Sequence, residues 1–310
     1  MKRDAGLFAA VVGVSAMVTA GFGWLPVLIG WCIGTVVLLL LPERRKTGMG
    51  KFTAVVVLVG GIFVLAAGAL GAEDAFPEDT TFPFISAAML LLVWRSMCGE
   101  KNTGSAVANL LGLVLLPMVG VVLLFGLKDV RWAENLPLGE PWWQIPVTVA
   151  VTSPWWCFRS GTMEKRSWLW YGLAAVFSVG MSLLTRGILG RGLVLAEEFP
   201  LYRAVQTIRI LGVLQRMEAL LAAAVLMGAF CIMAFVASKM TEALEVLLPG
   251  TKRRWKAAWT LAAAFAVEFC LRTMKIRMYD VLEAVFWGMI PVLALWMVFS
   301  GKIEKIPKTP

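Results

Sequence analysis

The chain has 310 residues, of which 59% are hydrophobic and only 16% are charged, and its formal net charge is +9. Soluble domains carry about 25% charged residues, so this composition excludes an ordinary soluble fold and indicates a protein embedded in lipid. The Lys and Arg residues lie in short connections between apolar runs, which argues against a nucleic-acid-binding surface. No histidine occurs and the five cysteines are widely spaced, so we expect no enzymatic activity, no metal site and no cofactor.

Ten apolar runs follow one another along the chain, each close to the roughly 17–25 residues that cross a bilayer as a helix. Because strand-like alternation of polar and apolar residues is absent, we predict an all-α polytopic membrane protein with about ten transmembrane helices. In the first half the predicted helices cover residues 6–21, 24–41, 52–72, 82–97 and 106–127. In the second half they cover residues 142–158, 167–188, 217–239, 256–271 and 281–300.

Two sets of five helices would enter the membrane from opposite faces, because five is an odd number. This is the topology of a 5+5 inverted-repeat transporter, whose halves are related by pseudo-symmetry. We therefore expect a single transmembrane domain over residues 1–310. Its first repeat would cover residues 1–134 and its second repeat residues 135–301, followed by a cytoplasmic tail at 302–310.

The distribution of Lys and Arg predicts the orientation, because cytoplasmic connections collect these residues. With the N-terminus inside, nineteen of the 29 Lys and Arg residues lie on the inner side. The connection at residues 73–81 carries only acidic charges, which fits the outer side. We expect an integral membrane protein, surrounded by the lipid bilayer, with both termini in the cytoplasm.

One outer connection, residues 186–216, is longer than the others and carries five arginines. Apolar residues recur in it at helical spacing: Leu201, Ala204, Val205, Ile208 and Leu211. We therefore predict an amphipathic helix over residues 197–216 on the outer face, with Pro200 in its first turn and acidic Glu197 near its positive end. Such a helix either packs on the bundle or forms a gate or a partner surface.

The first predicted helix of each half contains residues that favour a ligand site. Broken helices near the middle of the membrane expose backbone groups that bind carboxylates or cations, and small, hydroxylated and proline residues are typical of them. The predicted ligand-binding residues are Gly13, Ser15, Thr148, Thr152 and Ser153. The alternative is that these residues only let helices approach closely.

Three charged residues in or beside apolar runs are candidates for ion or proton binding or for a structural role. Glu268 lies inside the predicted helix at residues 256–271, where an ionised carboxylate is costly. It would either bind a proton or cation or pair with a basic group in the bundle. Arg216 and Glu218 flank the start of the predicted helix at 217–239, where an orienting ion pair is the simpler interpretation.

A pattern of residues extends through the predicted surface helix and the span that follows it. Its members are Phe199, Pro200, Ile208, Leu211, Gly212, Leu214, Arg216, Glu218, Ala219, Leu220, Gly228 and Phe230. This pattern resembles the spore-germination permease family, the GerAB and GerKB type of B subunit of germinant receptors. The resemblance implies a LeuT/APC-like fold, similar to that of amino-acid permeases.

The resemblance also implies a function. A member of this family would be a B-type membrane subunit that senses a small nutrient, with an amino acid as the expected class, and triggers spore germination. Its expected partners are an A-type membrane subunit and a C-type lipoprotein in the inner membrane of the spore. One alternative is a secondary transporter of amino acids or organic cations with Glu268 as its proton or cation site. Another is a membrane scaffold that has lost ligand binding.

Overall fold

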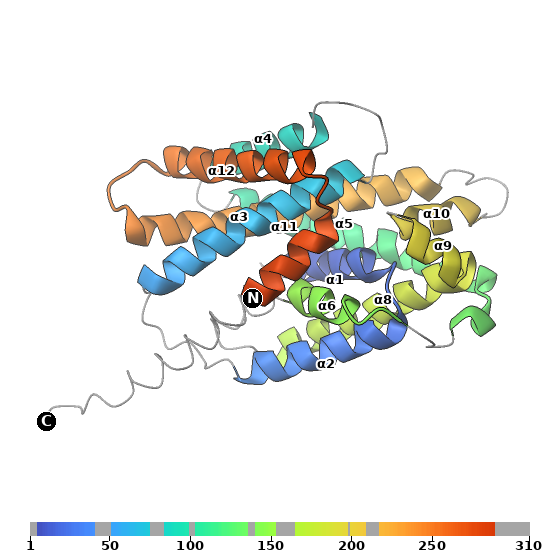
Figure 1. Cartoon of the computed structure of the whole chain (residues 1–310). Coiled ribbons are helices and arrows are strands. Elements are labelled where there is room, and N and C mark those ends of the chain that lie inside the picture. The colour runs from blue at the N-terminus through green and yellow to red at the C-terminus, as the bar shows by residue number, and fades with distance from the viewer. Residues whose placement is uncertain are drawn as a thin grey trace, which may run out of the picture.

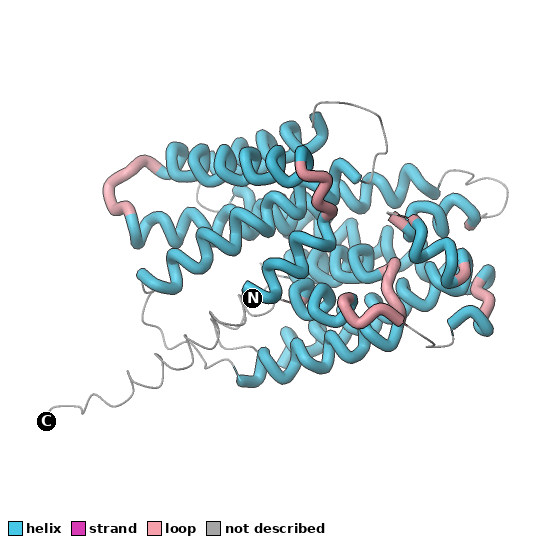
Figure 2. Tube along the Cα trace, viewed as in Figure 1, coloured by secondary structure: helices cyan, strands magenta, loops and turns pink. Residues whose placement is uncertain are grey.

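The structure is a computed structural model that describes residues 5–40, 51–74, 84–98, 103–135, 140–152, 165–197, 199–208 and 217–288. Every regular element in these residues is a helix and none is a strand, which confirms the predicted all-α class (Figures 1 and 2). The α-helices are α1 (Ala5–Thr19), α2 (Trp24–Leu40), α3 (Lys51–Asp74), α4 (Phe84–Cys98), α5 (Thr103–Gly126), α6 (Gln144–Val151), α8 (Lys165–Leu189), α9 (Arg191–Ala196), α10 (Pro200–Thr207), α11 (Met217–Leu247) and α12 (Arg253–Thr273). Two short 3-10 helices, η1 (Leu127–Asp129) and η2 (Trp132–Asn135), follow α5, and a further helical stretch covers Met278–Gly288.

Several of these helices are suited to cross a membrane. Within the described residues four are long and apolar enough, and they lie in α3, α5, α8 and α11. The number rises to five if α12 and Met278–Gly288, which are bent by 118° at their junction, form one span. The helices α1, α2 and α4 are apolar but shorter. A helix occupies each of the ten predicted spans, and the long apolar helices identify an integral membrane protein.

Large apolar side chains lie exposed along two of the long helices, α5 and α8. Leu110 and Leu124 on α5 are 67% and 70% exposed, and Leu169 and Val176 on α8 are 73% and 68% exposed. Water-facing surfaces rarely carry such rows, whereas lipid chains are as apolar as these residues. The periphery of the bundle is therefore suited to the bilayer core.

Eight of the described helices form two groups of four. The helices α3, α4, α11 and α12 pack against one another in the upper part of Figure 1, around buried residues such as Leu65 and Met233. The helices α1, α2, α6 and α8 form the second group in the lower part, with Trp31 and Val147 buried inside it. The helix α5 contacts both α1 and α11, so it connects the two groups.

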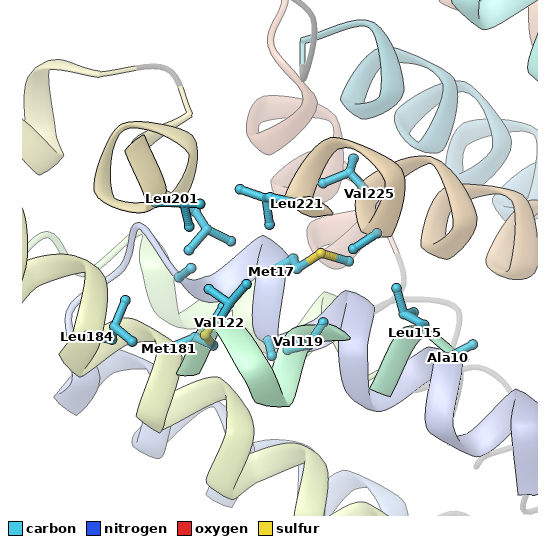
Figure 3. Packing of buried hydrophobic residues seen from close by; sticks show 14 of the residues in the cluster. Ala10, Met17, Leu115, Val119, Val122, Met181, Leu184, Leu201, Leu221 and Val225 are labelled. Carbon is cyan, nitrogen blue, oxygen red and sulfur yellow. The ribbon is translucent and has the colours of Figure 1, made fainter. Parts of the chain in front are cut away.

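A cluster of buried apolar side chains fills the junction between these groups. It contains Met17 of α1, Leu115 of α5, Met181 of α8 and Leu221 of α11, together with Leu201 of α10 (Figure 3). In lipid such a junction is held by van der Waals packing rather than by the exclusion of water. Close fit is therefore the main source of its stability.

Glycines provide the closest contacts between α1 and α5. A Cβ on Gly112 would collide with the carbonyl oxygen of Gly6, and a Cβ on Gly6 would collide with the backbone of Asn109. The side chain of Asn109 also reaches across, because its Oδ1 accepts a hydrogen bond of 3.0 Å from the amide of Leu7. The two backbones therefore touch along this line, which no larger residue would permit.

The predicted surface helix is confirmed in its buried face and wrong in its extent. Leu201, Ala204, Val205 and Ile208 are all buried, as their spacing predicted, and Pro200 occupies the first turn of α10. The helix begins at Pro200 rather than at residue 197, because the preceding Phe199 is not helical, and it ends at Thr207. A separate helix, α9, precedes it. Residues 209–216 lie outside the described residues.

We predict that Gly112→Ala lowers the thermal stability of the purified protein, because its methyl group would force α1 and α5 apart. Overpacking of this kind costs about 1–3 kcal/mol. Gly120→Ala on the same helix is the matched control, since a Cβ there meets nothing within 4 Å. That variant should keep or slightly raise the melting temperature, because Ala favours a helix by about 1 kcal/mol over Gly. Equal effects of the two substitutions would contradict the close approach.

Candidate functional site

The ligand site predicted in the first helix of each half requires a break in that helix, and α1 has none. It runs unbroken from Ala5 to Thr19. A Cβ on Gly13 would lie 2.8 Å from the Leu115 side chain, so this glycine accommodates α5 instead of unwinding α1. Ser15 is buried, and its carbonyl accepts a hydrogen bond of 2.8 Å from the Thr19 hydroxyl. The interruption predicted for this segment is therefore wrong.

Thr148 on α6 and Thr152, the residue that follows its end, face α2. A Cβ on Gly30 would lie 2.5 Å from the Thr148 Cβ, and a Cβ on Gly34 would lie 2.6 Å from the Thr152 hydroxyl. Both hydroxyls donate within α6, to the carbonyls of Gln144 at 2.8 Å and Val149 at 2.7 Å. The threonines thus fill the space left by two glycines, whereas Gly13 faces α5.

None of the four described ligand-site candidates lines the pocket that the structure shows beside the turn after α1. The fifth of them, Ser153, lies outside the described residues. The helix α6 has only 8 residues and ends at Val151, so it is as short as a helix broken within the membrane would be. A ligand-binding role for these residues stays a prediction, and the geometry of the described ones is that of closely packed helices.

Glu268 is fully buried on α12 and belongs to a polar network between α3, α4 and α12. Its Oε1 lies 3.3 Å from the hydroxyl of Ser86 on α4. The same hydroxyl lies 3.1 Å from Oε2 of Glu73 on α3, and the Ser86 amide donates to that oxygen at 3.0 Å. The other oxygen of Glu73 forms an ion pair of 3.1 Å with Arg272, one turn beyond Glu268 on α12.

The Ser86 hydroxyl has one proton and three acceptors within reach. Besides the two carboxylates, the carbonyl oxygen of Ala69 lies 3.2 Å from it. The contacts are satisfied together when Glu268 carries a proton and donates to Ser86, which then donates to Ala69 or Glu73. Glu73 and Arg272 would then form the charged pair of this network.

The remaining two candidates are only partly described. Glu218 lies in the first turn of α11, where its negative charge interacts favourably with the helix dipole. Arg216, its expected partner, lies outside the described residues. Their predicted ion pair therefore stays a prediction.

Sequence reasoning did not identify the other members of the network around Glu268. Arg272 follows Glu268 by four residues, so the spacing that places side chains on one helical face could have suggested it. Ser86 and Glu73 come from other helices, and no local pattern indicates which helix packs against α12. Within the described part of the chain no group of three or more His, Cys, Asp or Glu residues could hold a metal ion.

Comparison with known proteins adds no family to this description. No protein-family model matches the chain, and no curated protein matches it. What can be inferred about function therefore depends on the residues of this chain and on how they pack.

We predict that Glu268→Gln changes the free energy of unfolding by less than about 1 kcal/mol, because an amide can donate to Ser86 as a protonated carboxyl does. Glu73→Gln should cost more, about 1–3 kcal/mol, because it removes the carboxylate of the ion pair between Glu73 and Arg272. Thermal unfolding of both variants in the same detergent measures the difference. A larger loss for Glu268→Gln than for Glu73→Gln would show that Glu268 is the ionised member of the pair.

Proposed function

We propose that this chain is a permease-like B-type subunit of a spore germinant receptor, built from two inverted repeats of five helices. In this assignment α1, α2, α3, α4 and α5 correspond in order to α6, α8, α11, α12 and the stretch Met278–Gly288. The subunit would sense a small nutrient, with an amino acid as the expected class, in the inner membrane of the spore.

The observation that carries the proposal is the symmetry of the contacts within the two groups of four helices; between the groups, the α1–α11 contact has no comparable α6–α3 counterpart. Exchange of each helix with its counterpart turns the contact between α1 and α8 into that between α6 and α2, and both occur. It likewise turns α3–α12 into α11–α4 and α3–α4 into α11–α12, and all four of these contacts occur. Each group of four helices is thus unchanged by the exchange, as a pseudo-symmetric pair of repeats requires.

The resemblance over residues 199–230 supports the receptor assignment, and Gly228 and the helix that begins at Pro200 have structural roles. A Cβ on Gly228 of α11 would lie 2.6 Å from the Val14 side chain, so this glycine lets α11 approach α1. The apolar face of α10, which follows Phe199, packs against α8 and α11. A displacement of α1 would therefore reach α10 through direct contacts, which suits a sensor whose ligand favours one of two conformations.

A secondary transporter of amino acids or organic cations is the second candidate. The observation that favours it is the buried Glu268 network, because intramembrane carboxylates commonly bind the coupled proton or cation. In the receptor assignment the same network would contribute to the ion release that follows nutrient binding. A receptor subunit would require the A-type subunit and the C-type lipoprotein, whereas a transporter would function without them.

The test combines spores with reconstituted protein. We expect spores of the source organism that lack this chain to lose their germination response to an amino acid and to regain it on complementation. Complementation with the Gly120→Ala variant should also restore germination, because the added Cβ contacts no neighbouring atom. It therefore controls for effects of introducing a mutated gene. The purified chain alone should accumulate no radiolabelled amino acid in proteoliposomes. Accumulation driven by a proton or sodium gradient would instead favour the transporter, and normal germination without the chain would refute the receptor.

A further inference from the structure

The helix α12 begins with a cluster of basic residues. Four of the five residues from Lys252 to Lys256 are Lys or Arg, and the fifth is Trp255. The first turn contains no acidic residue, and the side chain of the N-cap residue, Lys252, makes no capping hydrogen bond. The free amides and the positive end of the helix dipole therefore lie beside further positive charge. This arrangement is unfavourable unless an anion binds there.

Lys256 supplies independent evidence for a ligand at this turn. Its side chain is 4% exposed and makes no ion pair or hydrogen bond with the part of the chain that the structure describes. Its amide donates to the carbonyl of Lys252 at 3.3 Å, which places it one turn into the helix. Helical side chains lean toward the N-terminus, so the Lys256 ammonium group is directed over the first turn. A charge buried in this way requires an oppositely charged partner.

Exposed tryptophans place this turn at the membrane surface. Trp255 and Trp259 lie one turn apart on α12 and are 56% and 72% exposed. Tryptophan rings concentrate at the level of the lipid headgroups. In Figure 1 the start of α12 lies at the same end of the upper group as the end of α11 and the start of α3. The exposed Lys51 begins α3 there, so basic residues collect at this end.

We propose that the first turn of α12 binds the phosphate of an anionic phospholipid headgroup. The phosphate oxygens would accept hydrogen bonds from the free amides of the turn and from the ammonium group of Lys256. The exposed Lys252 and Arg254 would add positive charge around it. The rings of Trp255 and Trp259 favour a lipid over free phosphate, because they lie where the headgroup joins the acyl chains. This site does not depend on the receptor assignment.

Native mass spectrometry of the full-length protein in detergent, titrated with phosphatidylglycerol or phosphatidylcholine, tests the site. The wild type should prefer phosphatidylglycerol. Lys256→Gln should weaken its binding about fivefold, the usual contribution of one basic side chain at a membrane surface, and Lys256→Arg should preserve it. Arg254→Gln should have a similar effect, and because Arg254 is exposed this variant decides the question if Lys256→Gln does not fold.

The matched control is Lys239→Gln, which removes a positive charge at the same end of the bundle. Lys239 lies on α11 and is paired with Glu242 at 2.9 Å, so its loss should change the affinity by less than about twofold. An equal loss in Lys239→Gln and Lys256→Gln would show that binding follows net charge, which refutes the site. Equal binding of the two lipids by the wild type would refute it as well.

Competition with inorganic phosphate separates the two sources of the anion. A lipid site should keep phosphatidylglycerol bound in an excess of inorganic phosphate, and replacing both Trp255 and Trp259 by Ala should weaken lipid binding. If inorganic phosphate displaces the lipid and the double tryptophan variant binds like the wild type, the turn binds free phosphate and the lipid assignment is wrong.

Discussion

Close approach of helix backbones around α1 is the constraint on which the rest of the structure depends. Three glycine contacts surround this helix: Gly112 of α5 lies against Gly6, Gly13 lies against Leu115, and Gly228 of α11 lies against Val14. Lipid offers no hydrophobic drive for helix association, so the attraction must come from atoms in contact. An unbroken α1 in the centre lets α5, α8 and α11 pack on it together, and the two groups of helices are joined through it.

The spans were largely predictable from the sequence, because the thickness of the bilayer sets the length of an apolar run. Most helix ends lie within three residues of the prediction. The main exception is α11, which continues to Leu247 because Lys239 and Glu242 extend it with an ion pair one turn apart. The buried face of α10 was equally predictable from the sequence, because its apolar residues recur at helical spacing and lie on one face of the helix.

The site was less predictable, because the same residues serve packing and binding. Glycines and threonines read from the sequence suggested broken helices, and in the fold Thr148 and Thr152 fill the spaces beside Gly30 and Gly34. Nor could the sequence pair Glu268 with Ser86, since that pairing depends on which helix lies beside α12. Long-range packing decides both questions, and local patterns carry little information about it.

The two polar networks are each confined to one group of helices. The network around Glu268 joins α3, α4 and α12, and that around Glu140 joins the turn after α1 to α6 and α8. A rigid-body displacement of one group relative to the other would therefore leave both networks intact. In the proposed inverted-repeat assignment, such a displacement is the expected change of state.

The seam between α2 and α6 gives this arrangement a mechanical property. The hydroxyls of Thr148 and Thr152 donate within α6, so their contact with the glycines of α2 is made by van der Waals packing. Gln144 at the start of α6, by contrast, is tied to the turn at Gly23. The start of α6 is thus held by a hydrogen bond, whereas the contacts of the two threonines with α2 are van der Waals contacts. Sliding of α6 along α2 would therefore break neither of the hydrogen bonds that these two threonines donate.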